Sequence, residues 1–95
     1  MLKVLSINNF IVFEIWYKDR VSDEIRLHRR ISILPDRITQ VESNKFESTW
    51  FVTIAWKDPH GGYIQEVIGS EEEARKRQDE ILQIIHNITF KERYG

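Results

Sequence analysis

The chain has 95 residues, enough for one domain around a single hydrophobic core and too few for a second. Apolar residues make up 41% and charged residues 31% of it, and the formal net charge is −1. This balance excludes a disordered chain and a global electrostatic attraction to nucleic acid or membranes. The absence of cysteine excludes disulfides and thiolate metal sites.

Isoleucine dominates the apolar residues, with 14 Ile against five Leu and two Ala. β-Branched side chains suit a pleated surface, so the composition favours a sheet with one helix over a helical bundle. The first residues lack the apolar run of a signal peptide, and the longest apolar run, 10–13, is too short to span a bilayer. We therefore expect a cytoplasmic protein.

Two strands are predicted at the N-terminus, over residues 3–7 and 10–17. Asn8 and Asn9 between them tolerate left-handed backbone angles and predict a tight turn. Residues 10–17 are apolar on both faces, which is typical of a strand that lies in the middle of its sheet or is covered twice.

Clean alternation predicts a third strand over residues 24–34. Its apolar face holds Ile25, Leu27, Ile31 and Ile33, and its polar face holds Arg26, His28, Arg30 and Ser32. Arg29 falls on the apolar side, which predicts a kink or a register break near it.

Residues 36–42 fit either a strand or a helical turn, and we favour a strand. A loop is expected at 43–48, followed by a hairpin of strands at 50–56 and 63–68. Pro59 and the glycines of its connecting loop supply the backbone angles that a hairpin turn needs.

An amphipathic helix is predicted over about 70–88, where Ser70 and Glu73 form a capping box. Its apolar stripe is Ala74, Ile81, Leu82, Ile85 and Ile88, with Ile84 at the edge and Gln78 interrupting it. Its solvent face carries three acid–base pairs four residues apart: Glu71–Arg75, Glu72–Lys76 and Glu73–Arg77.

These elements predict a single α+β domain over 1–95. We expect one strongly bent antiparallel sheet of five to six strands, with the C-terminal helix packed across it through Ile81, Leu82, Ile85 and Ile88. Short connections favour antiparallel strands, because a parallel crossover needs a longer link.

At residues 31–88 the chain resembles small, uncharacterised phage and bacterial proteins that have a β-sheet and a C-terminal helix. The matching residues are the segment Ile33-Leu34-Pro35-Asp36-Arg37-Ile38, the strands 50–56 and 63–68, and Ser70-Glu71-Glu72-Glu73-Ala74. The order of strands and closing helix also looks like pleckstrin-homology-like domains. The resemblance implies an adaptor-like role and carries no site residues across.

The aromatic residues suggest a protein-binding face. Trp50 and Trp56 share a strand face and predict an aromatic core beneath the helix. A single helix cannot cover both faces of a sheet, so Phe10, Trp16 and Phe51 are predicted to form an apolar patch on the other side. Such a patch would bind a protein partner or a second copy of the chain in a homodimer.

Arg26, His28 and Arg30 support an alternative, a nucleic-acid-binding module. Alternate residues of one strand would align these groups about 7 Å apart, beside a stacking ring of the neighbouring strand. Acidic residues nearby favour the plainer interpretation of a solvated outer face.

No catalytic, metal or cofactor site is predicted. Histidines 28, 60 and 86 have no metal-ligand spacing. Asp58 and His60 could suggest a catalytic loop, but turn formation explains that segment better. We expect a non-catalytic protein-interaction module, an adaptor or inhibitor encoded by a phage or mobile element.

Overall fold

The computed structural model describes residues 1–57 and 60–94, with side chains up to residue 91, so Asp58, Pro59 and Gly95 lie outside the described residues. The strands are β1 (Leu2–Ile7), β2 (Phe10–Lys18), β3 (Ile25–Ile33), β4 (Ile38–Phe46), β5 (Thr49–Trp56) and β6 (Gly62–Ile68). A 3-10 turn, η1 (Pro35–Arg37), precedes β4, and a helix, α1 (Glu71–Tyr94), closes the chain. The predicted α+β class is confirmed.

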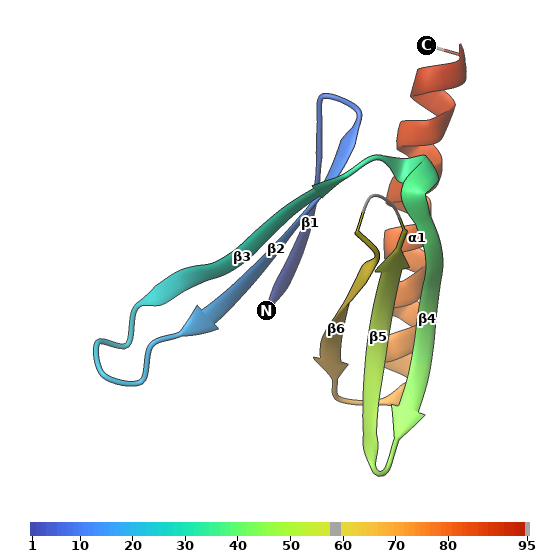
Figure 1. Cartoon of the computed structure of the whole chain (residues 1–95). Coiled ribbons are helices and arrows are strands. Elements are labelled where there is room, and N and C mark those ends of the chain that lie inside the picture. Colours follow the sequence, from blue (N-terminus) through green and yellow to red (C-terminus); the bar gives the residue numbers. More distant parts are fainter. Residues whose placement is uncertain (58–59, 95) are drawn as a thin grey trace.

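The six antiparallel strands form two sheets of three, in the orders β1-β2-β3 and β4-β5-β6. The single bent sheet that we predicted is not confirmed, because η1 separates β3 from β4. Pro35 has no backbone N–H and a fixed φ, so the strand cannot simply continue through it. Figure 1 shows the two sheets diverging, with the β2–β3 hairpin leaning away and α1 behind β4–β6.

A tight turn connects β1 to β2, and another connects β4 to β5. Asn8 and Asn9 both have positive φ, 50° and 67°, as the predicted turn requires. Glu47 has a φ of 58°, and β4 extends to Phe46, so the predicted loop at 43–48 is wrong. Polar residues of this segment have partners on neighbouring elements: Asn44 Oδ1, for example, accepts a hydrogen bond from Thr53 Oγ1 at 2.9 Å.

The core lies between the inner faces of the two sheets and α1. It consists of Leu2, Ile11, Phe13, Ile33, Val52, Ile54, Ile64, Ala74, Ile81 and Ile88. Trp50 and Trp56 pack against it, as predicted. Gly62 leaves room for the Trp56 ring, because a Cβ there would lie 2.7 Å from Trp56 Cζ2.

The helix begins as predicted, since the Ser70 hydroxyl accepts a hydrogen bond from the Glu73 N–H at 3.2 Å. It continues to Tyr94, well past the predicted end at 88, because no Gly or Pro interrupts the chain before Gly95. Leu82 is 44% exposed, so its predicted place in the buried stripe is wrong. It follows buried Ile81 by one residue, about 100° around the helix.

Gln78, which interrupts the apolar stripe, bonds to the edge of the second sheet. Its Nε2 donates to the backbone carbonyl of Val41 at 2.9 Å, and its Oε1 accepts from Ser43 Oγ at 2.8 Å. A polar residue at this helix position therefore satisfies backbone and side-chain groups of β4.

Arg77 and Glu66 join α1 and β6 to β1 of the other sheet. Arg77 Nε donates to Glu66 Oε1 at 3.0 Å, and Arg77 Nη2 donates to the Leu2 carbonyl at 2.7 Å. Glu66 Oε2 accepts from the Leu2 N–H at 3.0 Å. Both side chains are largely buried, so Arg77 does not form the predicted surface pair with Glu73.

Replacing Arg77 with alanine should lower the free energy of unfolding by about 2–4 kcal/mol, because Glu66 and the Leu2 carbonyl lose their donor in a largely desolvated site. Arg75→Ala is the matched control on the same helix, since Arg75 forms an exposed pair with Glu71. It should change stability by less than about 0.5 kcal/mol. Urea denaturation measures both values, and equal losses would contradict the importance of this junction.

Candidate protein-binding face

A β-bulge interrupts the pairing of β2 with β3 where a register break was predicted. Ile15 pairs with Arg29 but Trp16 pairs with Leu27, so His28 is an extra residue on β3. An extra residue reverses which sheet face the side chains beyond it point to. Leu27 therefore lies on the opposite face from the one that simple alternation predicts.

The bulge also separates the basic residues of the nucleic-acid alternative. Arg30 pairs with Glu14 and Arg26 pairs with Tyr17, and these two residues of β2 point to opposite faces. His28 lies near Tyr17, with their ring centroids 6.0 Å apart. The predicted alignment of Arg26, His28 and Arg30 on one face is thus wrong.

Acidic neighbours reduce the positive charge around Arg26 and Arg30. Arg30 Nε lies 3.1 Å from Glu14 Oε2. Arg26 lies 3.4 Å from Asp19 and 3.2 Å from Glu24. These contacts match the solvated, self-neutralised surface expected from the sequence, not a continuous phosphate-binding strip.

The first sheet carries an apolar face on the side away from the core. Ile11 and Phe13 are fully buried, so the even-numbered residues of β2 and their cross-strand partners point the other way. The apolar residues of this open face are Met1, Leu5, Ile7, Phe10, Val12, Trp16, Ile25 and Leu27. Six of the eight are 37–66% exposed, whereas Trp16 is half-buried and Val12, in the middle of the face, is only 2% exposed.

A polar row crosses the open face and divides it into two apolar patches. One patch consists of Leu5, Ile7, Phe10 and Val12, and the other of Met1, Trp16, Ile25 and Leu27. Lys3, Glu14 and Arg30 are direct neighbours on β1, β2 and β3. Glu14 forms an ion pair with Arg30 and accepts a hydrogen bond from Trp16 Nε1 at 3.2 Å. Lys3 Nζ lies 5.2 Å from the centre of a Trp16 ring. The carboxylate is thus already engaged, while the two cations retain donors for a partner.

The structure separates the three residues of the predicted apolar patch. Phe10 and Trp16 lie on the open face at its two ends, but Phe51 lies on the second sheet, between Asn44 and Val67. Phe10 is exposed, and Trp16 and Phe51 are half-buried. The prediction missed the open-face residues of β1 and β3. Those of β1 could have been found from the alternation of that strand, whereas the bulge in β3 reverses the orientation that alternation predicts.

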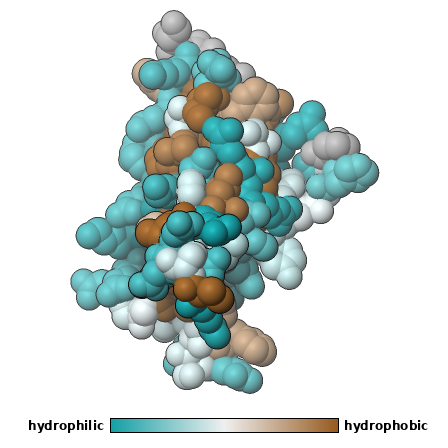
Figure 2. Space-filling model, turned by 90° about the vertical axis from the view of Figure 1, so that its left-hand side faces the viewer, coloured by the Kyte–Doolittle hydropathy of each residue, from teal (hydrophilic) through white to brown (hydrophobic). Residues whose placement is uncertain are grey.

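The β2–β3 hairpin beyond the bulge projects as an arm in which every residue from 20 to 30 is exposed (Figure 1). Figure 2 views the molecule from the side of this arm and shows apolar side chains interrupted by hydrophilic ones. At the distal end of the open face, Met1, Trp16 and Ile25 help to line an apolar hollow of about 210 Å³. An aromatic or aliphatic anchor of a partner fits such a hollow.

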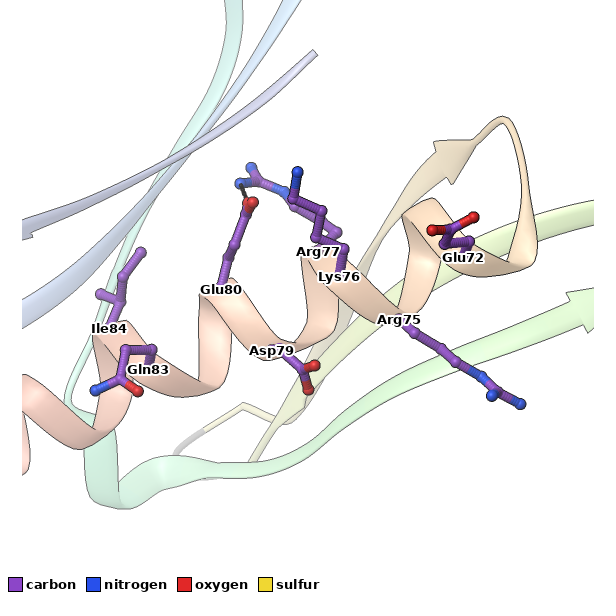
Figure 3. A pocket seen from close by; sticks show the side chains of 8 residues that line it. All are labelled: Glu72, Arg75, Lys76, Arg77, Asp79, Glu80, Gln83 and Ile84. Carbon is purple, nitrogen blue, oxygen red and sulfur yellow. Dashed lines mark hydrogen bonds and ion pairs between the residues drawn. The ribbon is translucent and has the colours of Figure 1, made fainter.

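A broader depression of about 870 Å³ runs along α1 and offers no catalytic arrangement. Its lining residues all belong to the helix: Glu72, Arg75, Lys76, Arg77, Asp79, Glu80, Gln83 and Ile84. Figure 3 shows these side chains fanning outward, with Arg75 and Asp79 directed away from the pair that Arg77 forms with Glu80 at 3.3 Å. Residues that diverge in this way do not surround a reacting group.

Among the residues that the structure describes, no three metal-ligating side chains come together. Over the same residues, no helix is both long and apolar enough to cross a bilayer.

Comparison with protein-family models, curated proteins and solved structures finds no significant match for this chain. The resemblance to small phage and bacterial proteins and to pleckstrin-homology-like domains therefore stays a prediction. The functional interpretation rests on the open face and its chemistry.

Deleting His28 should preserve the fold, with a change in stability below about 1 kcal/mol, because it removes the bulge and leaves every other β3 side chain on its present face. Deleting Ser32 from the same strand is the matched control. It forces either Arg30 toward buried Phe13 or Ile33 out of the core, and should cost more than about 2 kcal/mol. Urea denaturation measures the free energy of unfolding of the two deletion variants. Similar losses of stability would show that His28 is not a simple insertion.

Proposed function

We propose that this chain is a non-catalytic protein-interaction module that binds its partner through the open face. The observation that carries the proposal is the exposure of apolar side chains on all three strands of one sheet. Exposed apolar patches on a small domain are characteristic of an interaction site. A module of this kind acts as an adaptor or as an inhibitor, depending on what its partner does.

The composition of the face supports protein binding. Phe10 and Trp16 provide aromatic groups, which are enriched at the energetic centres of protein interfaces. Leu5, Ile7 and Leu27 surround them with aliphatic surface. The charged row between the patches adds polar contacts that fix the orientation of a partner.

The outer face of the second sheet is a weaker candidate. It carries exposed Phe46, Tyr63 and Val67 and half-buried Phe51, but Glu42, Asn44 and Gln65 lie among them. Gln65 Nε2 donates to Thr53 Oγ1 at 3.1 Å. Polar side chains already bonded to one another are typical of a solvated surface. The same face supplies the control position for the test below.

Leu27→Lys should lower recovery of a bound partner about tenfold or more, because it buries an ammonium group in an apolar interface. Val67→Lys is the matched control, an exposed strand residue on the other sheet. Purification of the tagged full chain and both variants from its native cell extract, followed by quantitative mass spectrometry, provides the comparison. We expect a protein that is retained by Val67→Lys and lost by Leu27→Lys.

Identical recovery profiles for all three proteins, with light scattering showing a monomer in each case, would contradict the proposal. Circular dichroism checks that Leu27→Lys is folded, so that a loss of partner binding is not caused by unfolding. We expect it to fold, because Leu27 is exposed.

A further inference from the structure

We infer that the open face receives one amphipathic helix of an acidic partner protein. The helix lies along β2, with its apolar stripe over the two apolar patches and carboxylates on both of its flanks. This inference rests on the proposed function and adds the chemistry of the partner to it.

The width of the face fits a single helix. The first sheet has three strands, so its outer strands lie about 10 Å apart, two strand spacings. An α-helix with its side chains is about 10–12 Å across. One helix along β2 therefore reaches β1 and β3 together.

The length of the apolar surface also suits a helix of ordinary size. Phe10 and Trp16 mark its ends on β2, six residues apart, which corresponds to about 20 Å along a strand. About 13 helical residues span that distance, close to four turns. Apolar residues at helical spacing would reach Leu5 and Phe10 at one end and Trp16 and Leu27 at the other.

The charges of the face call for carboxylates on both flanks of that helix. Lys3 lies on β1 and Arg30 on β3, one on either side of Glu14. Glu14 is already paired with Arg30 and accepts a hydrogen bond from Trp16, so the charged groups of this row offer donors and no free carboxylate. The charged strand residues of the open face are Lys3, Lys18 and Arg30 against Glu14, a net charge of +2 in a chain whose total is −1. Of these, Lys18 pairs with Asp23 at 3.4 Å. An acidic helix complements this face of the molecule.

The same row disfavours a second copy of the chain as the occupant. A two-fold axis through Glu14 would place Glu14 against Glu14 of the second copy and Lys3 against its Arg30. Like charges in direct opposition at an interface are strongly unfavourable. A partner of opposite charge meets no such repulsion.

Two fluorescein-labelled helical peptides of about 18 residues test the inference. Both carry the same Leu, Ile and Phe stripe, and the flanking positions hold Glu in one and Lys in the other. Fluorescence anisotropy with the full chain should show the Glu peptide binding about tenfold more tightly at low salt, and the difference should shrink as salt is raised.

Lys3→Glu should weaken binding of the Glu peptide about tenfold and improve binding of the Lys peptide. Lys45→Glu, an exposed lysine of β4 on the other sheet, is the matched control and should leave both affinities unchanged. Because both lysines are exposed, both variants should fold, which circular dichroism checks.

Equal affinity for the two peptides, preference for the Lys peptide, or the same loss in Lys45→Glu would overturn the inference. A concentration-dependent dimer that Leu27→Lys abolishes would also overturn it, in favour of a second copy. If neither peptide binds but a cellular protein still depends on Leu27, the helix inference fails and the proposed function stands. If no cellular protein depends on Leu27 either, both fail.

Discussion

The arrangement of the two sheets depends on the contact of Arg77 and Glu66 with the backbone of Leu2. Two separate three-stranded sheets leave edges that backbone pairing does not satisfy. At this edge of β1, a carboxylate from β6 and a guanidinium from α1 take the place of a neighbouring strand. The next helix residue, Gln78, does the same for Val41 on β4. Two consecutive side chains of α1 thereby fix one helix against both sheets.

Because α1 is packed against both sheets, only their outer faces remain for binding. Two sheets have four faces, and α1 with the two inner faces forms the core. The outer face of the second sheet has exposed Phe46 and Val67, but polar residues such as Glu42 and Gln65 lie between them. The outer face of the first sheet has more apolar residues, among them Leu5, Phe10 and Leu27, and a single polar row between them. The asymmetry between these outer faces, not the total apolar content, is what points to an interaction surface.

Local sequence signals predicted most elements but not their assembly. Alternation, the Asn8-Asn9 turn and the Ser70 cap each depend on a few neighbouring residues, and the structure agrees with them. The division into two sheets depends on how β3 and β4 lie after Pro35, which is a long-range property. For the same reason Phe51 was grouped with residues of another sheet. Polar strand residues such as Ser43 were also missed, because their partners are distant in sequence.

The bulge at His28 changes the orientation of β3 residues that belong to the candidate site. Arg29 correctly indicated a register break, but alternation alone does not show that the residues before it change faces. Without the extra residue, Ile25 and Leu27 would share a face with buried Ile33 and point to the inner side of the arm. With it, they join Met1 and Trp16 on the open face. A bulge also makes an exposed edge strand a poorer template for pairing with another chain. The same insertion thus enlarges the apolar face and limits association through the edge of β3, which favours docking onto the face over extension of the sheet.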